Sequence, residues 1–420
     1  MTVKGALIRI VKWLGVVVVV LTAVVFAALI IGSRDIERPD DATIRVELSV
    51  RPPDCENVYL GFVAATNAVR VKAEGNPMLV PADEADRLVA TNVEALAIFH
   101  EAANRRVWYD VDVRDNGSLM VGITGLMHLY QIVRTKARRD VEQGRIAEAR
   151  QDAADLMAFA SKMSEEAETR LTWMVASSFR GAACSIALDI LATGKASDAD
   201  LTALKTLVGK RAAAKFDVRR LVYADFRYSL TRQLWRGPNP SLRERYLFQP
   251  NRTLAEIIVR SQEVVAMLEK DYDRTIGNQR ASGDGMMPDQ WWRLPNAGGR
   301  RFADMFLGIW LSWPRMRASD AFGCLAAETC LAAEQFRRAN GRVPAALDEL
   351  VPKFLSAVPI DPFESSRPLS YDAERGVIWT IGPDGDYNGQ MRTSRQILLG
   401  ARYARRLDGR RIKAEGRRTD

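Results

Sequence analysis

The feature that most constrains this chain is an uncharged apolar stretch near its N-terminus, from Trp13 to Gly32. The stretch is twenty residues long and contains five consecutive valines, Val16 to Val20. Twenty helical residues span about 30 Å, which is the hydrocarbon thickness of a lipid bilayer. A helix that is apolar all round offers no polar face to water, which disfavours a surface helix of a soluble domain. The sequence therefore predicts a transmembrane anchor at residues 13–32, embedded in membrane lipid.

The flanks of this stretch predict its orientation. Lys4, Arg9 and Lys12 precede it without any acidic residue, whereas acidic and basic residues are mixed after it. By the positive-inside rule, residues 1–12 form a basic cytoplasmic stub and the rest of the chain lies outside. We therefore expect a single-pass protein of the bacterial inner membrane with a periplasmic body. A cleaved signal peptide is the alternative, although its apolar core is usually only about 7 to 15 residues long.

The net positive charge of the chain comes from its two ends. The formal net charge is +8, and residues 392–420 alone carry ten basic and three acidic side chains. The remaining 379 residues, without the stub and this basic tail, hold 47 basic and 49 acidic side chains. A nucleic-acid-binding domain concentrates basic residues on a folded face, so no nucleic-acid partner is expected.

Residues 43–315 are expected to form an external domain of many helices after one short strand. Apolar and polar residues alternate over residues 43–50, which is the pattern of a half-buried strand. Asp54 stands where a helix N-cap is expected, before a helical stretch. Trp108, Trp173 and Trp235 are interpreted as large apolar side chains between packed helices.

A helical hairpin is predicted at residues 119–163, with Gly144 as the stop of its first helix. The two helices must pack antiparallel because the turn between them is short. It resembles a single tetratricopeptide unit, but no 34-residue period is present. Two later helices are expected to start at capping boxes, formed by Ser197 with Asp200 and by Thr253 with Glu256.

A long segment at residues 277–300 has no helical or strand periodicity and is rich in glycine and proline. It contains the adjacent Trp291 and Trp292. Loops of this length are uncommon in compact domains and are usually covering loops, lids or binding segments. We expect a loop packed on its own helices, with a lid or partner-docking role as the alternative.

The C-terminal part reads as a small α+β module at residues 318–391. A helix ends at Gly341 and is followed by Leu347, Leu350 and Val351, and then by two short strands near residues 369–371 and 377–381. The motif order is Asn340-Gly341-Arg342-x-Pro344, then Pro359-x-Asp361-Pro-Phe, and then Gly382-x-Asp384-Gly385. This order resembles the C-terminal domain of the major pseudopilins of type II secretion systems, over about 75 of the 420 residues.

The resemblance implies the pseudopilin fold for this module, but it does not imply filament assembly. In pseudopilins the membrane helix continues directly into the helix before the module, whereas about 285 residues intervene here and no processed leader is visible. Val343 also replaces the usual aromatic residue, and a later aspartate of the loop is missing. The whole plan of the chain is similar to that of membrane-anchored bacterial envelope proteins without an assigned activity.

The loop after the last predicted strand is a candidate calcium site. Asp384, Asp386 and Asn388 alternate, which places oxygen ligands where a turn can wrap a hard cation. The resemblance to pseudopilins, which hold calcium in the comparable loop, extends only to Asp384. The alternative is a glycine-rich turn with solvated carboxylates.

The four cysteines do not indicate a disulfide-stapled fold. Cys324 and Cys330 fall in one helix, six residues and about 9 Å apart, too far for a disulfide between them. Packing is the expected role of both, and a bond between Cys55 and Cys184 stays open.

No motif of a known catalytic class occurs in the sequence, so no catalytic or organic-cofactor residue is predicted. His100 and His128 are interpreted as helix-packing residues. The acid pairs Asp271 with Asp273 and Glu165 with Glu166 are not distinguishable from surface charges. The expected function is an interaction or scaffolding unit with an envelope protein partner. The resemblance to pseudopilins, and nothing else in the sequence, places that partner near a secretion or pilus-like system. A hydrolase with paired carboxylates in a helical groove, and a protein that binds a small or lipidic ligand, are the alternatives.

Overall fold

The computed structural model describes residues 3–46, 50–73, 80–114, 123–209, 217–233, 241–270, 272, 295–374, 376–383 and 404–406. These residues are mainly helical, with a few short strands near the C-terminus, as predicted. The helices are α1 (Val3–Gly32), α2 (Val58–Asn67), α3 (Ala82–Thr91), α4 (Val93–Ala103), α5 (Val111–Arg114), α6 (Ile123–Glu142), α7 (Ile146–Glu165), α8 (Arg170–Ala192), α9 (Asp198–Gly209), α10 (Val218–Gln233), α11 (Leu242–Leu247), α12 (Pro250–Leu268), α14 (Ala297–Trp310) and α15 (Trp313–Asn340).

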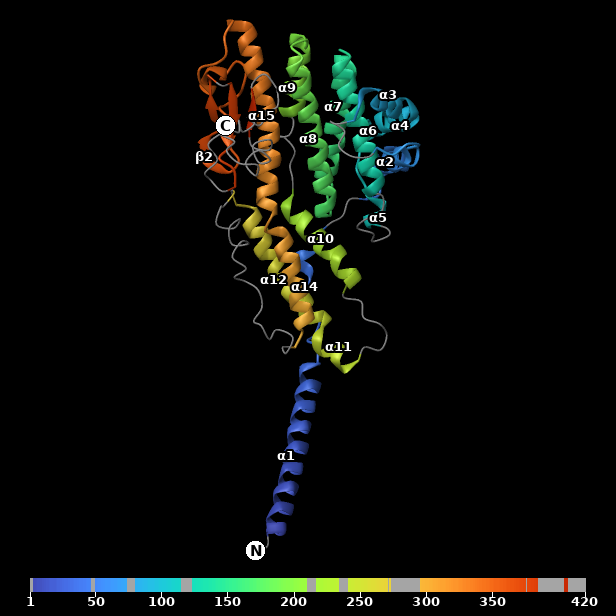
Figure 1. The fold of residues 1–420 in the computed structure, drawn as a ribbon, viewed down its shortest axis with the longest axis vertical. Helices are drawn as coiled ribbons and strands as arrows, with labels where there is room; N and C mark the ends of the chain where they lie inside the picture. The colour runs from blue at the N-terminus through green and yellow to red at the C-terminus, as the bar shows by residue number, and fades with distance from the viewer. Residues whose placement is uncertain are drawn as a thin grey trace, which may run out of the picture.

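The apolar helix α1 extends away from the rest of the molecule. Figure 1 shows it alone at one end of an elongated structure, with the strands toward the other end. Its segment Lys12–Gly32 is long and apolar enough to cross a membrane, and none of it is buried against the protein. The helix α8 passes the same test of length and composition, but 67% of it is buried, as in the core helix of a soluble domain.

Two large hydrophobic cores lie along the described part of the body, and we name them by their distance from α1. The proximal core is formed by α10, α12 and α14 with the first turns of α8 and α15. Its large side chains include Trp173 and Trp313, whose ring centroids lie 4.2 Å apart. Trp173 and Trp108 are buried, as predicted, whereas Trp235 lies outside the described residues.

The prediction of a strand at residues 43–50 is wrong for the part that the structure describes. Ala42–Ile44 form a 3-10 turn, and residues 47–49 lie outside the described residues. Ile44 is buried in the proximal core, but Val50 is 89% exposed, so the two ends of the alternating pattern do not share a buried face. Arg45 instead turns back to pair with Asp41 at 2.8 Å.

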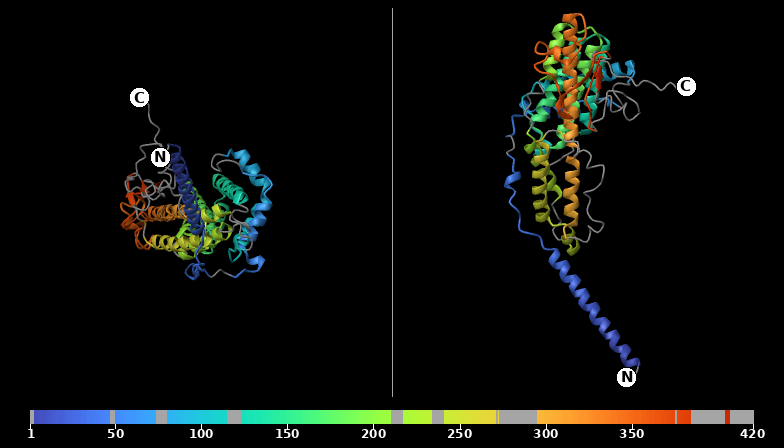
Figure 2. Two further views of the ribbon diagram at one scale, coloured as in Figure 1. Left: turned by 90° about the horizontal axis from the view of Figure 1, so that it is seen from below. Right: turned by 90° about the vertical axis from the view of Figure 1, so that its left-hand side faces the viewer.

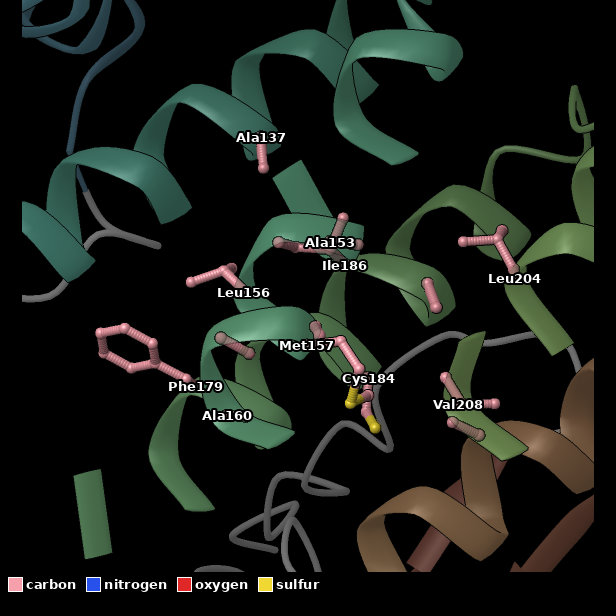
Figure 3. Packing of buried hydrophobic residues seen from close by; sticks show 14 of the residues in the cluster. Ala137, Ala153, Leu156, Met157, Ala160, Phe179, Cys184, Ile186, Leu204 and Val208 are labelled. Atoms are coloured by element: carbon pink, nitrogen blue, oxygen red, sulfur yellow. The ribbon is translucent and has the colours of Figure 1, made fainter. Parts of the chain in front are cut away.

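The distal core combines α2, α4, α6, α7, α8, α9 and most of α15. The predicted hairpin is present, because α6 and α7 pack together around Gly144, whose φ of +76° suits glycine. Ala137 on α6 and Ala153 on α7 are fully buried and allow a close approach of the two helices. Figure 3 shows them with Leu156, Phe179 and the rest of this packing.

The first residues of the helices show which of the predicted N-terminal caps are correct. The box of Ser197 and Asp200 is confirmed: Asp200 N donates to Ser197 Oγ at 3.1 Å, and Ser197 N donates to Asp200 Oδ2 at 3.0 Å. Asp54 is not the N-cap of α2, because it opens a 3-10 turn and Asn57 caps the helix by accepting from Tyr59 N. Thr253 does not open α12 either, since that helix already begins at Pro250.

The C-terminal module contains two small sheets. The strands β1 (Ile360–Asp361) and β2 (Glu364–Pro368) form an antiparallel hairpin that the sequence did not suggest. The predicted strands correspond to β3 (Ser370–Asp372) and β4 (Val377–Trp379), and β5 (Ala404–Arg406) adds to β4. Leu350, Leu369 and Ile378 join the distal core, so the module packs directly on the helices.

Candidate functional site

Among the described residues, the most unusual polar arrangement surrounds His100, at the end of α4. Asp152 and Asp155 lie three residues apart on one face of α7, and both are buried. His100 Nδ1 lies 2.5 Å from Asp155 Oδ2, and Nε2 lies 3.5 Å from Asp152 Oδ1. The prediction that His100 is a helix-packing residue holds, but its packing is polar, because its ring joins α4 to two carboxylates of α7.

The same group of charges extends to α6. Lys136 Nζ lies 2.9 Å from both Asp140 Oδ2 and Asp152 Oδ2. Arg145, in the turn after α6, donates from Nε to Asp140 Oδ1 at 2.7 Å. We call the set of His100, Lys136, Asp140, Arg145, Asp152 and Asp155 the charge cluster. With His100 protonated, three cationic side chains face three carboxylates.

Burial sets the protonation behaviour of the charge cluster. It raises the pKa of Asp152 to about 6, and the neighbouring Lys136 ammonium opposes that rise. Burial also lowers the pKa of Lys136, but Asp152 and Asp140 outweigh it and the pKa is raised overall. The Lys136 ammonium thus stabilises the charged form of Asp152 against the effect of burial.

The charge cluster is arranged to hold helices together. Glycoside hydrolysis needs two carboxyl groups that face a substrate about 5 to 9 Å apart. Here Asp152 and Asp155 are buried, and both ring nitrogens of His100 face carboxylate oxygens. This arrangement therefore favours a structural role, in which the charge cluster links α4, α6 and α7, over a pair of carboxyl groups that face a substrate.

The other residues that the sequence singled out do not assemble around this cluster. Glu165 is exposed, and Glu166 pairs with Arg220 at 2.5 Å. His128 Nδ1 lies 2.9 Å from the carbonyl oxygen of Ala73. Asp271 and Asp273, most of the segment 277–300, and Asp384, Asp386 and Asn388 lie outside the described residues. Within the part of the chain that is described, no group of three His, Cys, Asp or Glu side chains is placed to hold a metal.

A second polar arrangement fixes α1 to the body, at the start of α12. Asp35 follows α1, and its carboxylate accepts from Asn251 N at 2.8 Å and from Arg252 N at 3.0 Å. A carboxylate at these N-terminal amides satisfies donors that a helix leaves unpaired and complements its dipole. This contact explains why α12 starts at Pro250 without the box predicted at Thr253.

Gly32 completes this attachment, which we call the α1 junction (Gly32, Asp35, Tyr246, Gln249 and Asn251). The side-chain amide of Gln249 donates to the Gly32 carbonyl oxygen. A Cβ at position 32 would lie 2.7 Å from Tyr246 Cε2, so the ring of α11 packs where only glycine leaves room. The end of α1 is therefore held by both α11 and α12.

In the C-terminal module, the aspartate of the Pro-x-Asp-Pro-Phe motif has a structural role. Asp361 is fully buried, and its carboxylate accepts from Phe363 N at 2.9 Å, from Ile381 N at 3.0 Å and from the Thr380 hydroxyl at 2.5 Å. These bonds join the β1–β2 turn to the chain after β4.

Replacing Asp361 by alanine should destabilise the module strongly. It leaves three buried donors without their acceptor, at about 1 to 3 kcal/mol for each unsatisfied group, so we expect a loss of at least about 3 kcal/mol. Hydrogen exchange should show faster exchange at Ile381 and Phe363. The variant Asp348→Ala, at an exposed position, is the control, and equal exchange in the two variants would contradict the role of Asp361.

A buried carboxylate on α10 gives a pH dependence. Asp225 is 8% exposed and accepts from Arg170 N, at the start of α8, at 3.2 Å. Burial raises its pKa from 3.8 to about 6. Because the folded state keeps the proton to higher pH than the unfolded state, the stability that neutral Asp225 provides is present below pH 3.8 and is lost as pH rises through about 6.

Asp225→Asn should therefore stabilise the protein at neutral pH. Because the pKa of Asp225 is raised by roughly two units, ionising it in the folded state costs about 2 to 3 kcal/mol, and asparagine avoids that cost. The resulting gain in the free energy of unfolding should vanish near pH 4. Urea unfolding of both proteins at pH 4.5 and pH 8 measures this difference, with Asp348→Asn as the exposed control. A gain that is the same at both pH values would contradict the assignment.

Comparisons with known proteins add no relative: no family model, no curated protein and no solved structure matches this chain.

Proposed function

We propose that this chain is a single-pass protein of the bacterial inner membrane whose external helical body is a scaffold for an envelope protein partner. In this proposal α1 is the anchor, residues 1–12 are cytoplasmic, and the body is periplasmic. The observation that carries it is that the apolar segment Lys12–Gly32, uncharged from Trp13 on, is unburied and directed away from the body (Figures 1 and 2). A helix with this exposure in water would leave a large apolar surface unpartnered.

The α1 junction supports an anchor that positions the body. Gln249 binds Gly32 at the end of the apolar segment, and the backbone amides of Asn251 and Arg252 bind Asp35 just after it. A flexible linker would instead let the body move freely relative to the membrane. The attachment therefore favours a body that stands in a defined orientation on the bilayer.

The path of the chain supports a role in presenting the C-terminal module. Asn296 N donates to Tyr246 O beside the α1 junction, and α14 and α15 then lead away from it toward the strands (Figure 2). Their 14 and 28 residues correspond to a combined length of about 60 Å. The scaffold would hold the module well outside the bilayer surface.

The kind of partner follows from the resemblance of residues 318–391 to major pseudopilins. It favours a secretion or pilus-like assembly in the envelope. Calcium binding by Asp384, Asp386 and Asn388 is part of this proposal, and it requires that millimolar calcium raise the melting temperature.

Site-specific photo-crosslinking tests the scaffold role. Val343 and Ile360 are exposed apolar residues of the C-terminal module, at 43% and 48% exposure, and suit a photoreactive amino acid. Val259, exposed on α12, is the matched control. We expect one discrete protein adduct from the module positions in intact cells and none from Val259. Absence of an adduct at both module positions, with the protein present at normal level in membranes, would contradict the proposal.

A further inference from the structure

The contact between α8 and α15 brings two cysteines together. Arg180 Nη1 lies 2.6 Å from Asp320 Oδ2, and Ser177 donates to Asp320 Oδ1 at 2.9 Å. Cys184 and Cys324 each follow the ion pair by four residues, one helical turn later, and their Sγ atoms lie 3.5 Å apart. The two helices therefore run parallel and in register over these two turns.

The register is fixed by buried groups on both helices. The side chains of Arg180 and Asp320 are only 6% and 4% exposed. A buried ion pair tolerates little sliding, because displacement by one turn would leave both charges unpaired in the interior. Small, fully buried neighbours such as Ala183 and Ala327 allow the two backbones to stay close beside the cysteines.

Cys324 is the cysteine within reach of Cys184. A disulfide has sulfur atoms about 2.05 Å apart, so the two thiols need a shift of about 1.5 Å. Cys330 lies six residues beyond Cys324 on α15, about 9 Å along the helix. Cys55 is exposed in the 3-10 turn before α2, which gives no support to the pairing with Cys184 that the sequence left open.

We propose that Cys184 and Cys324 form a structural disulfide that staples α8 to α15. This inference rests on the proposed periplasmic location, because disulfides persist in oxidising compartments. The two thiols lose two protons and two electrons, the S–S bond forms, and the disulfide of an exported thiol–disulfide oxidoreductase takes up the electrons and becomes a dithiol.

The bond forms while the chain folds. In the folded protein the hydrogen bond with Cys324 and burial raise the pKa of the Cys184 thiol, so little of the reactive thiolate is present. Once formed, the buried disulfide is shielded from reductants. Dithiothreitol should therefore reduce it only when a denaturant is added.

Mass spectrometry of protein from intact cells, with thiols trapped by N-ethylmaleimide under denaturing conditions, tests the bond. Trypsin releases Cys184 in the peptide 181–195, and Cys324 with Cys330 in the peptide 318–337. We expect these two peptides to be joined, with Cys330 carrying the maleimide. Cys330→Ser should keep the linked pair and Cys324→Ser should lose it.

Thermal melting gives a second readout of the same bond. The disulfide closes a loop of about 140 residues, so Cys324→Ser should lower the melting temperature by about 6 °C, with little change in Cys330→Ser. With the body shown to be periplasmic, recovery of both thiols in the maleimide-modified form, together with equal melting temperatures of the two variants, would overturn the proposal.

Treating membrane vesicles with diamide distinguishes a failure of the proposed disulfide from a failure of the proposed periplasmic location. If the body is cytoplasmic, the thiols are found reduced in cells, and the proposed function fails. Partial unfolding and refolding with diamide should still join the peptides 181–195 and 318–337, because the pairing depends on the helix register. If the body is periplasmic and diamide yields no such link, the geometric assignment itself is wrong.

Discussion

Replacing Leu21 and Val24 by lysine is expected to abolish membrane insertion of the full-length chain. Both side chains lie near the centre of the apolar segment and are about 57% and 58% exposed along α1. A lysine at the centre of a membrane helix costs about 2.5 to 3.5 kcal/mol, so two of them oppose insertion by about 6 kcal/mol, a factor of about 10⁴. Membrane flotation of the variant measures the loss.

The controls for this prediction separate charge within the span from charge elsewhere. Val93→Lys and Val259→Lys introduce the same charge at exposed positions of the body and should leave membrane association unchanged. An intact mass of 46.9 kDa for the membrane-bound protein would show that the anchor is retained. A protein shortened after residue 27 would instead support the signal-peptide alternative.

Removing the carboxylate of Asp320 is expected to produce a large loss of folding stability. Asp320→Ala leaves the Arg180 guanidinium buried without its counter-charge and removes the acceptor of the Ser177 hydroxyl. Breaking a buried pair in this way costs about 3 to 5 kcal/mol. Urea unfolding should show this loss, and the register of α8 on α15 should weaken with it.

A double-mutant cycle separates the energy of the ion pair from the packing energy of the two side chains. Arg180→Met with Asp320→Leu removes both charges and should be less destabilising than Arg180→Met or Asp320→Leu alone. Arg150→Ala is the matched control, because it breaks the partly exposed pair with Asp200 and leaves the Ser197–Asp200 box intact; it should cost less than about 1 kcal/mol. Equal costs for the two pairs would contradict the role given to Asp320.

Most helices, and those of their ends that are set by neighbouring residues, could be predicted from the sequence. Gly144 and Gly341 follow helices and have positive φ, as the position of each glycine suggested. The box at Ser197 and Asp200 also follows from neighbouring residues. Such signals depend on interactions within a few residues, which the sequence displays directly.

The missed features depend on residues that are distant in the chain. Asp35 caps α12 across more than 200 residues, so the start of that helix was placed three residues late, at Thr253. His100 meets Asp152 and Asp155 only after the hairpin packs on α4. The i,i+4 spacing of Lys136 and Asp140 is the one local signal in the sequence from which charges inside the hairpin could have been predicted.

The most direct test of the membrane topology uses Cys55, which is exposed, whereas Cys184, Cys324 and Cys330 are buried. Spheroplasts are treated with a membrane-impermeant maleimide before and after lysis, with Cys55→Ser as the control. Our account predicts that Cys55 is labelled fully before lysis in protein that sediments with membranes. Labelling of Cys55 only after lysis, or recovery of the full-length chain with the cytosol, would contradict it.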